Sequence, residues 1–260
     1  MKKYTVLILA GVKTSFKYRF KIITSILFNS IYLCLLYFVW RSIYNDKITI
    51  SGLTFLQTYT YMCISTVLTY LYNSRTDWKM SMRIVNGSII SYYTKPLPVQ
   101  LQFFFEAIGN VCVIFLLVVM PVVLVVLRIR QLGIYMNFVF FLFSLLLAFT
   151  INFCMEYIVG TIAFFTESLW GIIILKNTLI SFFSGGLIPL RLFPETMQSL
   201  LQWFPFRCII DVPISILFEP NIGIDVIFAL IVQLTWAVVL VLVSQLFFKI
   251  SEKVLTINGG

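Results

Sequence analysis

Two charged side chains lie inside apolar stretches of the sequence. Glu156 lies in the apolar run 137–165 and Lys176 in the run 169–188. A charge at the centre of a membrane helix costs about 2.5–3.5 kcal/mol on insertion scales, so neither side chain should face lipid. If Thr166 marks the turn between two helices, both charges lie about 15 Å from that turn and at similar depth. We predict a Glu156–Lys176 ion pair; the alternatives are a gating or cargo-facing role and no contact.

The residue types in the sequence argue against a catalytic site or a metal site. The sequence has no histidine, which excludes His-ligated haem, His-based zinc sites and a Ser-His-Asp triad. It has no GxxxxGK[ST] sequence, so the chain has no P-loop that could bind a nucleotide phosphate. Five isolated cysteines without CxxC spacing indicate small apolar residues rather than disulfides or a metal site. We expect no catalytic residue, no metal site, no nucleotide-binding domain and no cofactor bound by this chain.

A break in an apolar helix is the second feature with chemical meaning. The segment 171–206 starts as an apolar run and is then interrupted by glycines and prolines. Irregular backbone at membrane depth is tolerated where protein or a water-filled cavity covers it. The break therefore indicates a transport path. The residues that we single out are Ser184, Gly185, Gly186, Pro189, Pro194, Pro205 and Phe206.

The composition of the chain requires a membrane around it. Of 260 residues, 60% are hydrophobic and 11% are charged, so the chain exposes too much apolar surface for a water-soluble domain. We predict an all-α polytopic membrane protein with a single transmembrane domain, 1–260. Six runs are long enough to cross about 30 Å of hydrocarbon. They are 22–44, 53–72, 101–127, 137–165, 169–188 and 222–248.

Basic residues orient these six spans. Twelve Lys and Arg residues flank the spans on the side of the two termini, against six on the other side. The positive-inside rule then makes both termini cytoplasmic, in the cytoplasmic (inner) membrane of a bacterium. The net charge of +9 is explained by these flanks, so we expect no nucleic-acid partner. The segment 189–221 is placed on the outer side.

The first residues, 1–21, have the pattern of a helix lying in the lipid headgroup layer. Lysines recur every four residues beside apolar ones, which gives a helix one basic and one apolar edge. A merely positive flank is the alternative. The residues are Lys13, Lys17 and Lys21 beside Val12, Phe16 and Phe20.

The loop 73–100 is the longest cytoplasmic connection that we predict. Its apolar and basic residues interleave as in a short amphipathic helix, which Asn86-Gly87 ends and Lys95-Pro96 follows with extended backbone. Such a helix could receive force from a soluble motor; an ordinary interfacial helix is the alternative. The candidate docking residues are Arg75, Trp78, Lys79, Arg83, Asn86, Gly87, Lys95 and Pro96.

Several short motifs, taken in order, resemble a known family. They occur at Trp40-Arg41, 84–89, 95–97, 163–170, 184–190, 193–194 and 205–206, followed by Pro213. Together they resemble ABC transporter permeases of the type-2 exporter class, in the compact six-span group associated with antibiotic, daunorubicin and viologen efflux. The family often has Ala-Phe-Trp where this chain has Ala163-Phe164-Phe165.

This resemblance implies a mechanism. The loop 73–100 would hold the coupling helix, and 189–221 would form an outward re-entrant helical hairpin over the path. Two such permeases, identical or paralogous, would work with two ATP-binding ABC subunits, which would bind ATP and Mg. The cargo would be an amphipathic drug, antibiotic, peptide or lipid-like molecule.

Two other functions compete with a permease subunit. A secondary transporter not driven by ATP predicts repeated broken helices, and the run 53–72 shows no counterpart of the break after residue 183. An intramembrane enzyme is disfavoured because the spans hold neither histidine nor a close carboxylate pair. Three asparagines in the spans are expected to make hydrogen bonds between helices. They are Asn110, Asn152 and Asn177.

Overall fold

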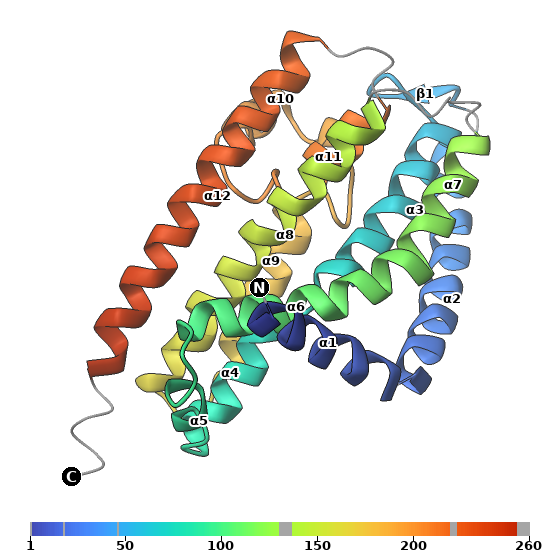
Figure 1. Ribbon diagram of the computed structural model, residues 1–260. Coiled ribbons are helices and arrows are strands. Elements are labelled where there is room, and N and C mark those ends of the chain that lie inside the picture. Colours follow the sequence, from blue (N-terminus) through green and yellow to red (C-terminus); the bar gives the residue numbers. More distant parts are fainter. Residues whose placement is uncertain (1, 18, 46, 130–136, 219–222, 254–260) are drawn as a thin grey trace.

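The computed structural model describes residues 2–17, 19–45, 47–129, 137–218 and 223–253, and shows a bundle of helices with two distinct ends (Figure 1). Six helices form most of the length of the bundle. They are α2 (Arg19–Tyr44), α3 (Phe55–Tyr72), α7 (Met120–Ile129), α8 (Asn137–Thr161), α9 (Trp170–Phe183) and α12 (Ile224–Ser251).

The other elements lie toward the two ends. At the lower end in Figure 1 are α1 (Lys2–Lys17), α4 (Thr76–Val85), α5 (Ile90–Tyr93) and α6 (Val99–Ile114). Toward the opposite end are the strands β1 (Thr49–Ile50) and β2 (Leu53–Thr54), and the helices α10 (Glu195–Leu201) and α11 (Asp211–Phe218). Three irregular turns complete the described chain: η1 (Phe115–Val119), η2 (Ile162–Phe164) and η3 (Leu190–Leu192).

Four helical stretches are long and apolar enough to cross a membrane: Ile23–Tyr44, Val99–Ile129, Phe138–Phe164 and Ile224–Ser251. They agree with four of the six predicted spans. The helix α3 has 18 residues, but its threonines and tyrosines make it less apolar. The helix α9 has 14 residues and measures about 21 Å, which is shorter than a bilayer core. For α3 and α9, a membrane crossing remains a prediction.

The third stretch, Val99–Ile129, bends where its hydrogen-bonding pattern changes. Residues Phe115–Val119 form a π-helical turn, and Pro121 directly after it has no N–H to donate. Both features bend helices. In Figure 1, α6 lies across the lower end of the molecule and α7 rises toward the other end. The bend lets one apolar run both line the lower end and traverse the bundle.

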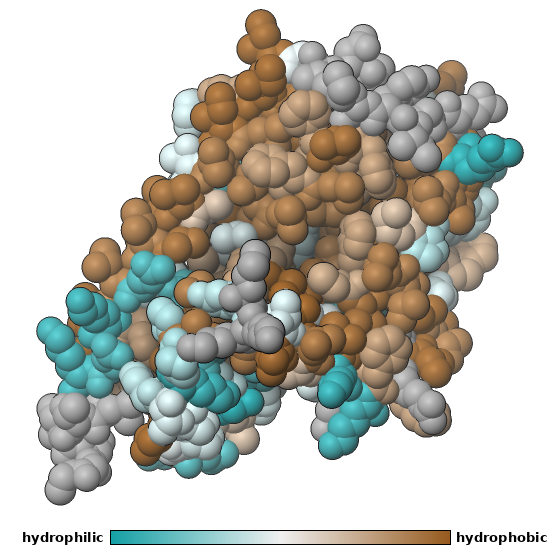
Figure 2. All heavy atoms as spheres, in the orientation of Figure 1, coloured by the Kyte–Doolittle hydropathy of each residue, from teal (hydrophilic) through white to brown (hydrophobic). Residues whose placement is uncertain are grey.

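The surface of the molecule is apolar over its middle and hydrophilic at its lower end. The carboxyl end of α12 lies at the same end as α1, α4 and α5 (Figure 1). Figure 2 shows apolar residues over the middle of the visible face and a concentration of hydrophilic residues at this lower end. Large apolar side chains of α2, α9 and α12 are exposed, among them Phe28, Leu175 and Leu246. Such a surface is stable against lipid and not against water.

Gln233 of α12 makes buried hydrogen bonds to other segments of the bundle. The amide of Gln233 in α12 donates to the carbonyl oxygens of Ser144 and Cys208 at 3.0 and 2.8 Å, and the Ser144 hydroxyl donates to Gln233 Oε1 at 2.9 Å. All three residues are buried. Because water does not compete there, these bonds fix how α12 packs on α8.

Candidate functional site

The short helix α4 packs tightly against α8. A Cβ atom placed on Gly160 of α8 would lie 3.0 Å from Met80 Cβ and 3.1 Å from Asp77 Cα. A Cβ at this position would be tightly crowded, so the neighbouring atoms of α4 would have to move by a few tenths of an ångström to admit it. Met80, Ser81 and Ile84 are buried on the inner side of α4. The loop 73–100 is therefore attached to the bundle and is not a free connection.

A buried ion pair joins α4 to α9. Lys176 Nζ lies 2.6 Å from Asp77 Oδ2, and both side chains are largely removed from solvent, with 10% and 3% exposed. Asp77 lies in the first turn of α4, where a carboxylate also interacts favourably with the helix dipole.

A second buried carboxylate holds the start of α4 from the α8 side. Glu156 Oε2 accepts hydrogen bonds from the Ser74 hydroxyl at 2.5 Å and from the Thr76 backbone N–H at 2.8 Å. Asn152, one turn earlier on α8, donates to Glu156 Oε1 at 3.2 Å and to the Tyr72 carbonyl at 2.9 Å. The amide N–H of Thr76 would otherwise be one of the unpaired donors of a helix start.

The predicted Glu156–Lys176 ion pair is wrong as a direct contact. Lys176 binds Asp77, and Glu156 binds Ser74 and Thr76. Both charges belong to one cluster, but α4 inserts a carboxylate between them. The sequence reasoning matched the two spans with each other and overlooked Asp77, which lies in a polar loop where an acid is unremarkable. The buried polar cluster comprises Ser74, Thr76, Asp77, Asn152, Glu156 and Lys176.

Two of the predicted docking residues, Arg83 and Lys95, contact an aromatic ring within the loop itself. The Arg83 guanidinium and the Lys95 ammonium each lie 4.7 Å from the centre of the Tyr92 ring, and this ring stacks on Phe103 with centroids 4.6 Å apart. Cation–π contacts of this kind stabilise a conformation. Gln102, which the sequence did not single out, closes the loop by donating to the carbonyl oxygens of Tyr92 and Leu97 at 2.7 and 2.8 Å.

The remaining predicted docking residues have different environments. Asn86 caps α4, and Gly87 follows with φ of 68°, a conformation that favours glycine. Arg75, Trp78 and Lys79 face a cavity beside α1 and α2. Pro96 lies in the turn that leads to α6. The predicted helix with its end at Asn86-Gly87 is confirmed, although only part of its basic edge is free.

An apolar surface on the loop faces away from the bundle. Met82 and Val85 on α4 and Ile90 on α5 are exposed by 45%, 48% and 65%. They lie at the hydrophilic end of the molecule, beyond the apolar band that a membrane would cover (Figures 1 and 2). Exposed apolar patches rimmed by polar residues mark protein–protein contacts. We name Met82, Val85 and Ile90 the loop patch.

The break after α9 folds the chain back into the bundle. The backbone N–H of Asp211 donates to the Ser184 carbonyl at 3.1 Å, so the segment leaves and returns at one place. Gly185 has φ of 85°, and a Cβ there would lie 2.3 Å from the Tyr61 hydroxyl. The Ser65 hydroxyl of α3 donates to the Gly186 carbonyl at 2.7 Å. Glycine is required at 185 by both its conformation and the closeness of α3.

Between Ser184 and Asp211 the chain forms the short helices η3 and α10, and a proline precedes each of them. Pro189 and Pro194 directly precede η3 and α10, where a missing N–H costs little. Pro205 starts the turn that leads through Phe206 to α11. The helix α11 is buried against α8 and α3, which agrees with a re-entrant shape. Residues 219–221 of the predicted segment lie outside the described residues.

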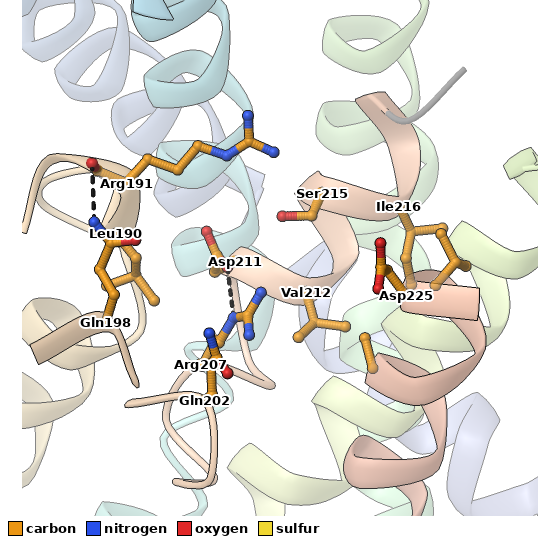
Figure 3. Close-up of a pocket in the computed structure, with 12 residues that line it drawn as sticks. Leu190, Arg191, Gln198, Gln202, Arg207, Asp211, Val212, Ser215, Ile216 and Asp225 are labelled. Carbon is orange, nitrogen blue, oxygen red and sulfur yellow. Dashed lines mark hydrogen bonds and ion pairs between the residues drawn. The ribbon is translucent and has the colours of Figure 1, made fainter. Parts of the chain in front are cut away.

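A polar pocket of about 270 Å³ lies beside this returning chain (Figure 3). Arg207 Nε lies 2.9 Å from Asp211 Oδ2, and the Tyr61 hydroxyl of α3 donates to Asp211 Oδ1 at 3.1 Å. Asp225 at the start of α12 also lines the pocket. The contact between Tyr61 and Asp211 was missed from the sequence because these two residues lie 150 residues apart.

Two of the three span asparagines bind between helices as predicted. Asn152 links α8 to α3, and Asn110 of α6 is hydrogen-bonded to Ser15 of α1. Asn177 is exposed on α9 and has no hydrogen bond to another residue that the structure describes. No group of three or more Cys, Asp or Glu among the described residues could hold a metal ion.

Comparison with known proteins assigns the family. No curated protein matches the chain. The family model described as "ABC-2 family transporter protein" matches residues 30–259, which covers α2 from residue 30 and all the described elements after it, including the loop with α4 and α5 and the segment between α9 and α12. The chain therefore belongs to the ABC-2 family of transporter proteins.

Proposed function

We propose that the chain is the membrane-spanning permease subunit of an ATP-driven exporter and forms half of its translocation path. Membership of the ABC-2 transporter family supports this proposal. Because the chain has no P-loop sequence, ATP and Mg would bind to two separate ABC subunits. The cargo class is an amphipathic drug, antibiotic, peptide or lipid-like molecule.

The observation that supports coupling most directly is the attachment of α4. The buried polar cluster ties the start of α4 to both α8 and α9, while the loop patch stays exposed. A motor that binds the loop patch and moves α4 would therefore move two long helices together. Differential contacts to the ATP-bound and ATP-free motor would shift the permease between its states.

A second permease, identical or paralogous, would complete the path. The helix α9 exposes most of its apolar side chains, and among them lies the amide of Asn177. A side-chain amide facing lipid has no hydrogen-bonding partner, so polar residues in such helices favour protein contacts. This supports α9 as part of the face between the two permeases.

The orientation proposed for the subunit follows the basic residues. Arg75, Lys79, Arg83, Lys95 and Lys249 all lie at the end that carries α1, α4 and α5. With this end in the cytoplasm of a bacterium, both termini are cytoplasmic and the re-entrant segment with its polar pocket lies on the outer side. The segment would then cover the outer mouth of the path.

The proposal is tested by purifying the tagged chain in mild detergent and identifying the proteins that accompany it. We expect ABC ATPase subunits in a one-to-one ratio with permease chains, and ATP hydrolysis that is required for cargo efflux from reconstituted vesicles. A secondary transporter predicts the reverse: no ATPase in the complex and efflux driven by an ion gradient without ATP. That result would contradict the proposal.

A further inference from the structure

A cavity of about 500 Å³ lies at the junction of α1 and α2, away from the pocket beside α11. Its walls come from α1, the start of α2, the end of α3, α4 and α6. Hydroxyl and amide groups line it together with apolar side chains. Six of these polar residues are Thr14, Thr24, Ser25, Asn29, Asn73 and Asn110.

The side chain of one cation in this cavity is unpaired. Arg75 is exposed, and its guanidinium makes no hydrogen bond or ion pair with the residues that the structure describes. Its backbone has φ of 53°, a left-handed conformation that costs a non-glycine residue free energy and is concentrated at binding sites and switches. The backbone of Arg75 is therefore strained, and its charge has no partner among the described residues.

The charged side chains that line the cavity give it a net positive charge. Lys79 Nζ lies 3.9 Å from Glu106 Oε1, and the Tyr92 hydroxyl donates to Glu106 Oε2 at 3.3 Å. Glu106 is the single carboxylate in the lining and is engaged by both groups. The cavity therefore offers the donors of Arg75, and the side-chain amides of Asn29 and Asn73, to a ligand with negative charge.

Apolar surface continues from this cavity along α2. Phe28 lines the cavity and is 72% exposed, and Leu27 and Ile31 beside it on α2 are also exposed. The helix α1 crosses the end of the bundle at this level (Figure 1). A ligand that fits has an anionic head for the cavity and an apolar tail for α2.

We propose that this cavity binds the phosphate headgroup of an anionic lipid, with Arg75 as its principal cation and the acyl chains lying along α2. Arg75 pairs with the phosphate as a planar, permanently charged donor. The phosphate pairs with Arg75, whereas the one carboxylate in the lining, Glu106, is engaged by Lys79 and Tyr92. This site does not depend on the proposed export function.

The test uses the full-length protein in detergent and native mass spectrometry, with phosphatidylglycerol and phosphatidylcholine of the same acyl chains as probes. Three variants accompany the natural protein. Arg75→Asn removes the charge, and asparagine tolerates the left-handed backbone. Arg75→Lys keeps the charge. Arg128→Asn removes another exposed arginine, at the far end of α7, and is the control.

We expect the natural protein to bind phosphatidylglycerol at least about tenfold more tightly than phosphatidylcholine. The choline ammonium of phosphatidylcholine offsets the charge of its phosphate, whereas phosphatidylglycerol keeps a net negative charge for Arg75, and one charge-assisted contact corresponds to about one decade in Kd. Arg75→Asn should lose this preference, whereas Arg75→Lys and Arg128→Asn should keep most of it. Equal binding of the two lipids, or equal loss in Arg75→Asn and Arg128→Asn, would overturn the proposal. So would displacement of the lipid by millimolar inorganic phosphate, which would identify a soluble phosphate compound as the occupant.

Discussion

At the scale of single residues, the main result is the position of three charges. Asp77, Glu156 and Lys176 lie in one buried cluster, and two of them are acidic residues. The pair Asp77–Lys176 is direct, whereas the Glu156 carboxylate is stabilised by neutral donors. Removing one partner of a buried pair leaves an unpaired charge and destabilises a protein by about 3–5 kcal/mol. The cluster is therefore sensitive to any single change.

The first prediction concerns this pair. Lys176→Ala should lower the Tm in detergent and the yield of monodisperse protein, since Asp77 would remain buried and charged. The reversed pair Asp77→Lys with Lys176→Asp should recover most of the loss. The corresponding reversal of Glu156 and Lys176 should not, because these two do not contact each other. Tm is measured by fluorescence-detected size-exclusion chromatography after heating.

Lys79→Ala is the control for this series. Its ammonium lies 3.9 Å from Glu106 and is 33% exposed, so its loss should cost no more than about 1 kcal/mol. If Lys79→Ala and Lys176→Ala lowered Tm equally, or if the Glu156–Lys176 reversal were the one that recovered, the assignment of the pair would be wrong.

At the scale of elements, two helix contacts depend on glycine. A Cβ on Gly109 of α6 would lie 2.1 Å from the Ile8 carbonyl oxygen, and one on Gly11 of α1 would lie 2.3 Å from the Glu106 carbonyl oxygen. These atoms belong to the backbone and cannot move aside. The crossing of α1 over α6, with the Ser15–Asn110 hydrogen bond beside it, is fixed by two residues without side chains.

The second prediction follows from this crossing. Gly109→Ala should detach α1 from α6, lower Tm and make α1 accessible to protease at Lys13 or Lys17. Gly171→Ala is the matched control, because a Cβ there meets nothing within 4 Å; alanine in that helix should be neutral or raise the stability by up to about 1 kcal/mol. Equal effects of the two substitutions would contradict the crossing geometry.

The third prediction concerns the loop patch. Met82→Asp places a charge on an exposed surface and should leave folding intact. If a partner ATPase docks there, the substitution should weaken its co-purification at least about tenfold, because a charge without a partner would be buried in the contact. Ile48→Asp is the control: Ile48 is 88% exposed, next to β1 at the opposite end. Unchanged ATPase recovery with Met82→Asp would exclude this surface from docking.

At the scale of the whole molecule, the distribution of hydrophilic residues and the arrangement of the elements distinguish the same two ends. The apolar band in Figure 2 separates an end with α1, α4 and α5 from an end with the hairpin β1–β2. The hairpin turns at Ser51 and Gly52, both with positive φ, which is the geometry of a tight connection between strands. A membrane centred on the band would leave the loop patch and the re-entrant pocket on different sides.

The fourth prediction tests this orientation. In a variant without native cysteines, Ile48→Cys should react with a membrane-impermeant maleimide added to intact cells, whereas Asn86→Cys should react only after the membrane is opened. Both positions are exposed and lie at opposite ends. Labelling of Asn86→Cys in intact cells would contradict the proposed orientation. It would show that the end with α4 faces outward and that the positive-inside rule does not hold for this chain.

The elements of the fold were predictable to different degrees. The boundaries of the first, third, fourth and sixth apolar runs agree with the helices to within a few residues, because length and hydropathy alone identify such helices. The end of α4 at Asn86-Gly87 was predictable from local backbone preference. The fifth run was predicted to be 20 residues long, yet α9 ends at Phe183, because its last apolar residues belong to the folded-back segment.

The sequence by itself determined the membrane class of this protein, the places where its helices break, and the presence of charges that must be shielded from lipid. These properties depend on composition and on neighbours along the chain. Only the tertiary structure decided the partners: Asp77 for Lys176, Ser74 and Thr76 for Glu156, Tyr61 and Arg207 for Asp211. Hydrogen bonds and ion pairs act over about 3–4 Å, so they depend on which distant segments the packing brings together.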